Sequence, residues 1–227
     1  NRSVVTTPTE IVKYMVDKTL SKVCDGKTPS EILDISVADI ACGSGIFLEE
    51  AFAYLQDYCV QWYICNGQTD HLIETGIDLY KLPLQEKKDI LCSCIYGIDI
   101  DIHAVEVAKF SLLIKLIEDE TAPSVSEVVP ILPDLGDNIQ FGNSLVSQTE
   151  LNGISGANHQ MMEIAPFDWS TINNGCGFDV IIGNPPYVNT EGMHALLPSA
   201  EVEIYKKKYK TSHKQFDKYF IFIEQAI

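Results

Sequence analysis

The feature of this chain that most constrains its fold is a short apolar run that ends in two prolines. Residues 178–187 read Phe-Asp-Val-Ile-Ile-Gly-Asn-Pro-Pro-Tyr. The run from Val180 to Ile182 is typical of a strand that is buried on both faces, as in a parallel sheet. Because proline has no N–H and cannot continue a central ladder, the chain must leave the sheet there. We therefore expect Asn184 and Tyr187 at the carboxyl edge of a strand, where open α/β sheets bind ligands.

The side chains after this strand predict how such an edge could bind a planar amine. The side-chain oxygen of Asn184 and the carbonyl of Pro185 are acceptors, and the following Pro186 keeps that carbonyl out of helical hydrogen bonding. Two converging acceptors suit an NH2 group and would aim its lone pair at an electrophile. Tyr187 offers a π face on which a flat ring can stack. An ordinary Pro-Pro turn is the alternative, and Tyr187 and the upstream motifs weigh against it.

Residues 184–187 resemble the catalytic motif of amino-methyltransferases that use S-adenosylmethionine. The Phe-Asp-Trp at 167–169, followed by 178–187, resembles the adenine-N6 DNA methyltransferases of restriction-modification systems with gamma-type motif order. The matched motifs run from Thr7 to the end of the chain. The resemblance implies an α/β fold, a doubly wound Rossmann-like methyltransferase sheet, with strands near residues 37, 96, 139 and 180.

The resemblance also implies a cofactor site for S-adenosylmethionine. Thr7 and the following proline mark a helix start, and in the family the matching threonine holds the methionine carboxylate of the cofactor. Residues 39–45 read Asp-Ile-Ala-Cys-Gly-Ser-Gly, whose glycines let the backbone approach a ligand closely. No P-loop lysine follows, which disfavours a nucleoside triphosphate site. The cofactor-binding residues that the resemblance implies are Thr7, Asp39, Ala41, Gly43, Gly45, Asp99, Ile100, Asn143 and Ser144.

Two acids follow the expected second strand. Such folds bind ribose hydroxyls with an acid at this place, and the resemblance gives that role to Asp99. Asp101 is then expected to cap the helix that starts near His103. The family often has Asp in the place of Asn143, close to the adenine of the cofactor. Since Asn can still accept from an exocyclic amine, we expect that role to persist.

The net charge of −16 argues at face value against nucleic acid, but the charges are unevenly distributed. Residues 206–218 hold six lysines and one acid, and no Lys or Arg occurs between Lys115 and Lys206. We expect Lys206, Lys207 and Lys208 to contact DNA phosphates, with a solvated surface run as the alternative. Phe222 matches an aromatic residue near the target base in the family, although core packing is the alternative for the aromatic residues around it.

Composition bounds the class of protein. A chain of 227 residues is enough for one domain, and no apolar run approaches the length of a bilayer span. Seven cysteines without regular spacing are typical of reduced thiols in a cytosolic protein, and no metal site is expected. The chain starts without Met and stops inside an apolar run, so we expect a fragment. Its expected parts are an N-terminal helical segment at 1–35, a cofactor-binding half at 36–145, and a catalytic half at 146–227 that is incomplete, without a target-recognition domain.

The sequence thus predicts methyl transfer to the N6 amine of an adenine flipped out of double-stranded DNA, in the cytoplasm of a bacterium or archaeon. A recognition domain or subunit and a restriction nuclease are the expected partners, and no membrane is involved. A protein glutamine-amide methyltransferase and an inactive DNA-binding or assembly subunit are the alternatives. Residues 66–82 are interpreted as an insertion of unknown role, and residues 189–199 as a loop over the site.

Overall fold

The computed structural model describes residues 7–121, 128–154 and 157–227. Within them the central sheet has four parallel strands, in the order β5-β4-β1-β6. Their bounds are β1 Val37–Asp39, β4 Ile95–Asp99, β5 Ile139–Phe141 and β6 Val180–Ile181. The chain steps outward from β1 to β5 and then returns to the other side of β1 with β6. The doubly wound parallel sheet and the four strand positions predicted from the sequence are confirmed.

Long helices cover one face of the sheet. Side chains alternate between the faces of a strand, so Val37 packs on this side while Ala38 packs on the other. The helices that bury their apolar residues on the Val37 side are α1 Thr9–Cys24, α3 Ile46–Cys65, α4 Leu84–Cys94 and α5 Ile102–Ile117, with the single turn α2 Pro29–Ile32 beside them. We call these helices the long-helix layer.

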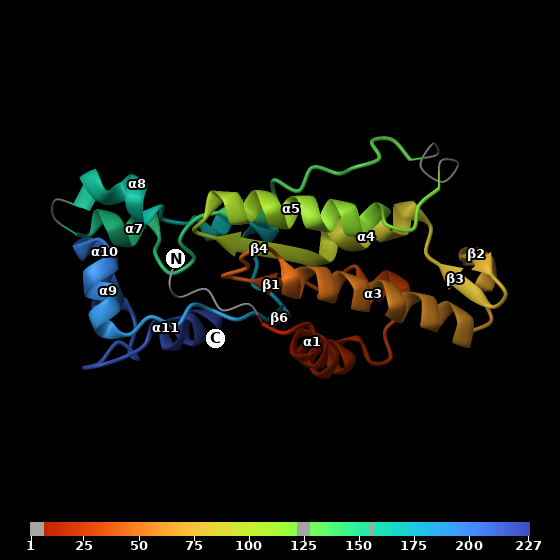
Figure 1. Ribbon diagram of the computed structural model, residues 1–227, viewed down its shortest axis with the longest axis horizontal. Coiled ribbons are helices and arrows are strands. Elements are labelled where there is room, and N and C mark those ends of the chain that lie inside the picture. Colours follow the sequence, from red (N-terminus) through yellow and green to blue (C-terminus); the bar gives the residue numbers. More distant parts are fainter. Residues whose placement is uncertain (1–6, 122–127, 155–156) are drawn as a thin grey trace.

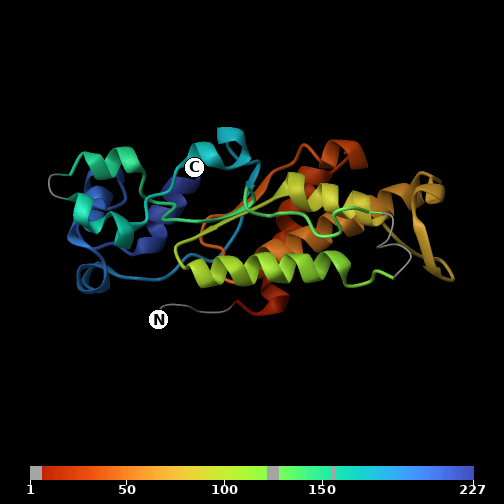
Figure 2. The same ribbon diagram turned by 90° about the horizontal axis from the view of Figure 1, so that it is seen from above.

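Shorter elements from the C-terminal part of the chain cover the other face. They share a second cluster with Ala38, Tyr96 and Ile98 of the sheet. We call them the short-helix layer: α7 Gln148–Asn152, α8 Met161–Ile164, α9 Thr190–Leu196, α10 Ser199–Lys208 and α11 Lys218–Ala226. Turns of 3-10 helix lie at η2 Ala157–Gln160, η3 Trp169–Thr171 and η4 Asn173–Gly175. Figures 1 and 2 both show α7 to α11 gathered at one end of an elongated molecule.

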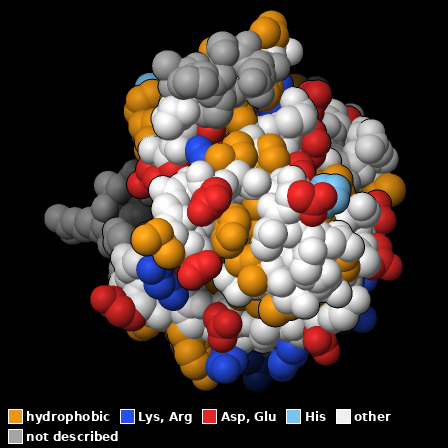
Figure 3. All heavy atoms as spheres, turned by 90° about the vertical axis from the view of Figure 1, so that its right-hand side faces the viewer, with side chains coloured by type: hydrophobic (Ala, Val, Ile, Leu, Met, Phe, Trp, Pro, Cys, Tyr) orange, Lys and Arg blue, Asp and Glu red, His pale blue; other side chains and the backbone are white. Residues whose placement is uncertain are grey.

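The segment interpreted as an insertion forms a small hairpin at the opposite end of the molecule (Figure 1). A 3-10 turn, η1 Thr69–His71, leads into the antiparallel pair β2 Ile73–Gly76 and β3 Leu79–Lys81. Ile77 at the tip is 91% exposed. Figure 3 looks onto this end and shows hydrophobic side chains scattered among acidic and basic ones.

The prediction of a loop at 189–199 is wrong for most of its length. Residues 190–196 form α9, and α10 begins at Ser199. Asn189 caps α9 because its Oδ1 accepts from the N–H of Gly192 at 2.8 Å, and Met193 anchors the helix in the core. The sequence did not predict this helix because Gly192 lowers helix propensity and Met193 is its one buried residue, so the helix has no apolar periodicity.

No helix among the described residues combines the length and the apolar character needed to cross a membrane.

Candidate active site

The loops that follow the four parallel strands meet at one edge of the sheet. Asp39 ends β1, Asp99 ends β4, Asn143 follows β5, and Asn184 follows β6. Parallel strands in register present their carboxyl ends together, and the reversal of strand order between β1 and β6 opens a crevice there. The structure therefore brings the predicted cofactor segments and the predicted catalytic segment to the same edge.

The glycine loop after β1 is bonded to the end of β4. The N–H of Gly43 donates to Oδ2 of Asp99 at 2.8 Å, and the N–H of Cys42 donates to the carbonyl of Ile98 at 3.0 Å. Gly45 has φ of 90°, and a Cβ there would lie 3.0 Å from the Cβ of Ala108 in α5. Nothing lies within 4 Å of a Cβ built on Gly43, so space for a ligand remains beside the loop.

Asp39 is a buried acid wedged behind the catalytic segment. It is 3% exposed, and its Oδ1 accepts from the N–H of Ala41 at 3.0 Å. A Cβ on Gly183 would lie 2.3 Å from that oxygen, so only glycine fits one residue before Asn184. Burial raises the pKa of Asp39 to about 7; the Ala41 hydrogen bond opposes the rise, and the charge of Asp99 adds to it.

The two acids at the end of β4 have different partners, and the role predicted for one of them, Asp101, is confirmed. Asp101 caps α5, because its Oδ1 accepts from the N–H of His103 at 2.9 Å, which confirms the predicted cap. Asp99 accepts from Gly43 and, through Oδ1, from the N–H of Asp101 at 2.8 Å. Burial raises the pKa of Asp99 against these hydrogen bonds. A carboxylate oxygen has a second lone pair, so Asp99 keeps acceptor capacity for hydroxyl donors.

Thr7 and Asn184 are hydrogen-bonded although they lie 177 positions apart in the chain. Nδ2 of Asn184 donates to Oγ1 of Thr7 at 3.1 Å. Thr7 lies just before α1, and Asn184 lies in the turn after β6. The residue expected to hold the cofactor carboxylate thus touches the residue expected to hold the reacting amine.

Asn143 and Ser144 are occupied by contacts within the protein. Asn143 is 3% exposed; its Oδ1 accepts from the N–H of Leu145 and its Nδ2 donates to Oε1 of Glu201, both at 3.1 Å. Ser144 donates its hydroxyl to the carbonyl of Ile40 at 2.7 Å. The Ser144 bond ties the turn after β5 to the segment that follows β1, and the Asn143 bond to Glu201 ties the same turn to α10. A direct contact of either residue with a cofactor stays a prediction. Ile100, the residue after β4, is 45% exposed, and its predicted contact with the cofactor also stays a prediction.

The segment after Tyr187 is fastened to the start of α11 by contacts that the sequence did not predict. The N–H of Val188 donates to Oδ1 of Asp217 at 3.0 Å, and the N–H of Lys218 donates to the carbonyl of Val188 at 2.8 Å. The ring of Tyr187 is 53% exposed, and its centroid lies 5.5 Å from that of Tyr219. Asp217 therefore holds the backbone next to Tyr187, and Tyr219 packs near the Tyr187 ring, which is predicted to stack on the substrate.

A hollow of about 140 Å³ lies beside the glycine loop and the catalytic segment. Its lining includes Asp39 and Ala41, Gly183 and Pro185, and Phe222 of α11. Phe222 is 7% exposed. The ring of Phe222 thus lines the same hollow as the predicted cofactor loop. Its contact with the target base stays a prediction.

The six lysines of 206–218 do not form one open surface. Lys208 turns inward, pairing with Glu150 at 3.0 Å and donating to the carbonyl of Leu145 at 3.2 Å. Lys218 is 7% exposed and pairs with Glu201 at 3.4 Å. The lysines of the cluster that remain exposed are Lys206, Lys207, Lys210 and Lys214.

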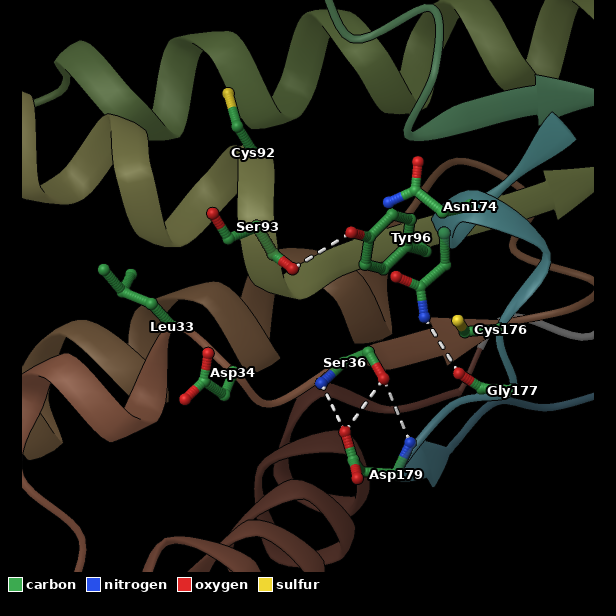
Figure 4. A pocket seen from close by; sticks show the side chains of 11 residues that line it. Leu33, Asp34, Ser36, Cys92, Ser93, Tyr96, Asn174, Cys176, Gly177 and Asp179 are labelled. Carbon is green, nitrogen blue, oxygen red and sulfur yellow. Dashed lines mark hydrogen bonds between the residues drawn. The ribbon is translucent and has the colours of Figure 1, made fainter.

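A larger hollow of about 500 Å³ lies at the opposite edge of the sheet, at the amino ends of the strands. Figure 4 shows its lining, in which Tyr96 reaches the carbonyl of Ser93 and Ser36 contacts Asp179. Oδ2 of Asp179 accepts from both the N–H and the hydroxyl of Ser36, at 2.8 and 2.9 Å. These contacts join the starts of β1 and β6. None of the predicted site residues lines this hollow.

Comparison with known proteins identifies relatives along the whole chain. The family described as Eco57I restriction-modification methylase matches residues 93–227. The type II restriction enzyme and methyltransferase RM.Eco57I of Escherichia coli is 47% identical over 227 residues, all of this chain and 22% of that protein. The putative type II restriction enzyme and methyltransferase RM.MjaORFECS2P of Methanocaldococcus jannaschii is 34% identical over 122 residues, 54% of this chain and 9% of that protein. The chain spans about a fifth or less of the length of these relatives.

Two solved structures share the fold. One is a nuclease-deletion mutant of the type ISP restriction-modification enzyme LlaGI in complex with a DNA substrate mimic, with TM-score 0.56 and 17% identity over 98% of this chain and 17% of that one. The other is a DrdV–DNA complex, with TM-score 0.55 and 18% identity over 99% of this chain and 19% of that one.

Proposed function

The chain belongs to the Eco57I restriction-modification methylase family, and on that premise we propose that it is the catalytic part of an adenine-N6 DNA methyltransferase. The methyl donor in this proposal is S-adenosylmethionine. The observation that carries it is the hydrogen bond from Asn184 to Thr7 at the carboxyl edge, in the crevice between β1 and β6. That contact puts the side chain proposed to bind the amine beside the N-terminal turn of α1, where a carboxylate is favoured.

The residues at this edge suit S-adenosylmethionine. Asp99 has acceptor capacity for two ribose hydroxyls, and the space beside Gly43 admits a ligand close to the backbone. Ile100 and Phe141, each 45% exposed, give apolar surface for the adenine ring. When bound, the cofactor supplies a methyl group activated by a sulfonium leaving group.

The catalytic segment then acts by orienting the substrate amine. An amide carries its donor and its acceptor on opposite sides, so anchoring Nδ2 of Asn184 on Thr7 fixes where the acceptor oxygen lies. That oxygen and the carbonyl of Pro185 accept from the two N–H bonds of the amine and direct its lone pair to the methyl group, while Tyr187 stacks on the base. With the cofactor bound, transfer would form the new N–C bond as the S–C bond breaks, and the surplus proton would pass to water. Positioning supplies most of the rate, and no enzyme nucleophile takes part.

The substrate base must leave the duplex, because a buried methyl donor cannot be reached from inside a helix. Exposed Lys206 and Lys207 would hold flanking phosphates, and the pair of Lys207 with Glu203 is itself exposed to solvent. Lys208 is turned inward and paired with Glu150, so its contribution would be to hold α10 in place. Phosphate contacts position DNA without reading it. The named relatives combine restriction and methylation, so we propose that a recognition module and a nuclease work with this chain in the cytoplasm.

Labelled S-adenosylmethionine tests the proposal directly. The full-length protein is incubated with double-stranded DNA or with protein, and the labelled product is digested and identified as N6-methyladenine, N4-methylcytosine or methylglutamine. We expect N6-methyladenine, and none from Asn184→Ala. Methylcytosine would overturn the adenine assignment, and methylglutamine would overturn the DNA assignment. Cofactor binding with no transfer to any substrate would favour an inactive subunit.

A further inference from the structure

A buried polar cluster joins the turn after β5 to the helices α10 and α11. Glu201 of α10 is 1% exposed, and its Oε1 accepts from Nδ2 of Asn143 at 3.1 Å, from Nζ of Lys218 at 3.4 Å, and from the hydroxyl of Tyr205. All four residues are buried. Burial and the charge of Glu201 raise the pKa of Tyr205 well above its usual value, so its hydroxyl stays a donor. A buried carboxylate with three donors is tolerated because those donors replace its hydration.

This cluster is connected to both sides of the site. On the cofactor side, the N–H of Gly142 donates to the carbonyl of Asp99 at 2.9 Å, one residue before Asn143. On the catalytic side, the backbone N–H of Lys218 holds the carbonyl of Val188, next to Tyr187. A shift of Glu201 would therefore move the turn after β5 and the start of α11 relative to each other.

We propose that Glu201 is a positioning residue that makes an amide necessary at position 143. Its carboxylate needs a donor, so Asn143 presents its NH2 to Glu201 and turns its carbonyl oxygen to the N–H of Leu145. An acid at position 143 would put two carboxylates about 3 Å apart in a buried place, where only one can ionise readily. This inference rests on the proposed function for its effect on cofactor binding, but the pairing itself does not depend on that function.

Exchanging the two side-chain types tests the proposal. In Asn143→Asp the two carboxylates oppose each other, and in Glu201→Gln the ammonium of Lys218 loses its partner. The double variant N143D/E201Q restores one amide and one carboxylate to the cluster. Glu203→Gln is the matched control, because Glu203 lies on the same helix, is exposed, and pairs only with Lys207 among the residues that the structure describes.

Two measurements are made on the full chain: thermal unfolding without cofactor, and calorimetric titration with S-adenosylmethionine at pH 6 and pH 8. We expect N143D to lower the melting temperature and to weaken cofactor binding about tenfold or more at pH 8. The loss should shrink at pH 6, because a pair of carboxylates that shares one proton regains a hydrogen bond. The double variant should melt above either single variant, bind the cofactor within about threefold of the wild type, and show no such pH dependence.

A double variant that melts no higher than N143D, or N143D that melts and binds like the wild type at both pH values, would overturn the proposal. A wild-type chain that binds no S-adenosylmethionine would contradict the proposed function instead. In that case the melting temperatures of the four variants still decide whether Glu201 and Asn143 are coupled.

Discussion

Replacing Gly183 with alanine adds one methyl group at the most crowded point of the site. The Cβ would lie 2.3 Å from Oδ1 of Asp39 and 2.6 Å from its Cγ. The carboxyl group cannot easily retreat, because Asp39 is 3% exposed and bonded to the N–H of Ala41. Since the backbone angle at Gly183 is not in the left-handed region, space alone opposes the substitution. The segment that carries Asn184 must therefore move outward by about 1 Å to reach van der Waals contact.

The size of the effect follows from that displacement. Overpacking of a rigid site costs roughly 1–3 kcal/mol of folding stability, which is a loss of roughly 2–12 °C in melting temperature for a domain of this size. A shift of about 1 Å in a positioned group costs about a hundredfold in rate. Because Asn184 contacts Thr7, cofactor affinity should fall as well, but by less than the rate.

Three measurements check the reasoning: thermal unfolding, calorimetry with S-adenosylmethionine, and single-turnover methylation of DNA. Gly177→Ala is the control, since a Cβ there meets nothing within 4 Å and should change stability by less than about 0.5 kcal/mol. Asp39→Ala removes the obstructing carboxyl group, so Gly183→Ala should cause little further loss in that background. Additive losses in the double variant, or wild-type melting and rate in the single one, would show that the contact with Asp39 is not what excludes a side chain.

Four other changes have outcomes set by the structure. Asn184→Ala should abolish methylation while cofactor affinity stays within a few-fold, and Asn184→Asp should keep partial activity because one acceptor oxygen survives. Transfer of labelled methyl groups measures the activity of each variant, and calorimetry measures its cofactor affinity. Asp217→Ala should lower the single-turnover rate about tenfold or more with little change in cofactor affinity, and Asp217→Asn, which keeps the acceptor for Val188, should recover most of it. Burial raises the pKa of Asp39 from 3.8 to about 7, so the folded chain holds a proton that the unfolded chain releases. The stability that this proton confers is present below pH 3.8 and lost as the pH rises through about 7, so Asp39→Asn should gain melting temperature relative to the wild type across that window. Replacing Lys206 and Lys207 with Gln should weaken binding equally for all DNA sequences and lower the salt slope by roughly 0.9 for each phosphate that is no longer neutralised; an unchanged slope would mark the pair as a solvated surface.

A local sequence pattern was enough for β6, which the apolar run ending in Gly183 predicted, and the family resemblance supplied the other three strand positions. The cap at Asp101 followed from its place before a helix. Such patterns predict secondary structure and caps, which depend on residues close together in the chain, but not contacts between distant segments. The contact between Thr7 and Asn184 joins residues 177 positions apart, so no local pattern could predict it.

The parts of the site that escaped prediction depend on tertiary burial of polar groups. Glutamate and lysine are almost always exposed, so nothing in the sequence of α10 or α11 distinguishes Glu201 and Lys218 from their solvated neighbours. Asn143 could be assigned a place at the edge of the sheet, but its two internal partners come from other segments. In the sequence Asp217 has the features of an ordinary helix cap, and only the structure shows that it also accepts from the N–H of Val188.

The unequal construction of the two layers has a consequence for how the molecule opens. Helices α1, α3 and α5 have 16, 20 and 16 residues, whereas the helices from α7 to α11 have between 4 and 10. Helices of a few turns have little stability of their own and persist only while they are packed. Amide hydrogens of the short-helix layer should therefore exchange with solvent through local unfolding events that leave the long-helix layer intact. In such an event the segment after Tyr187 would lose its bonds to α11, whereas the glycine loop would stay bonded to the end of β4. The half of the crevice proposed to hold the substrate would then unfold and refold locally while the half proposed to hold the cofactor keeps its structure.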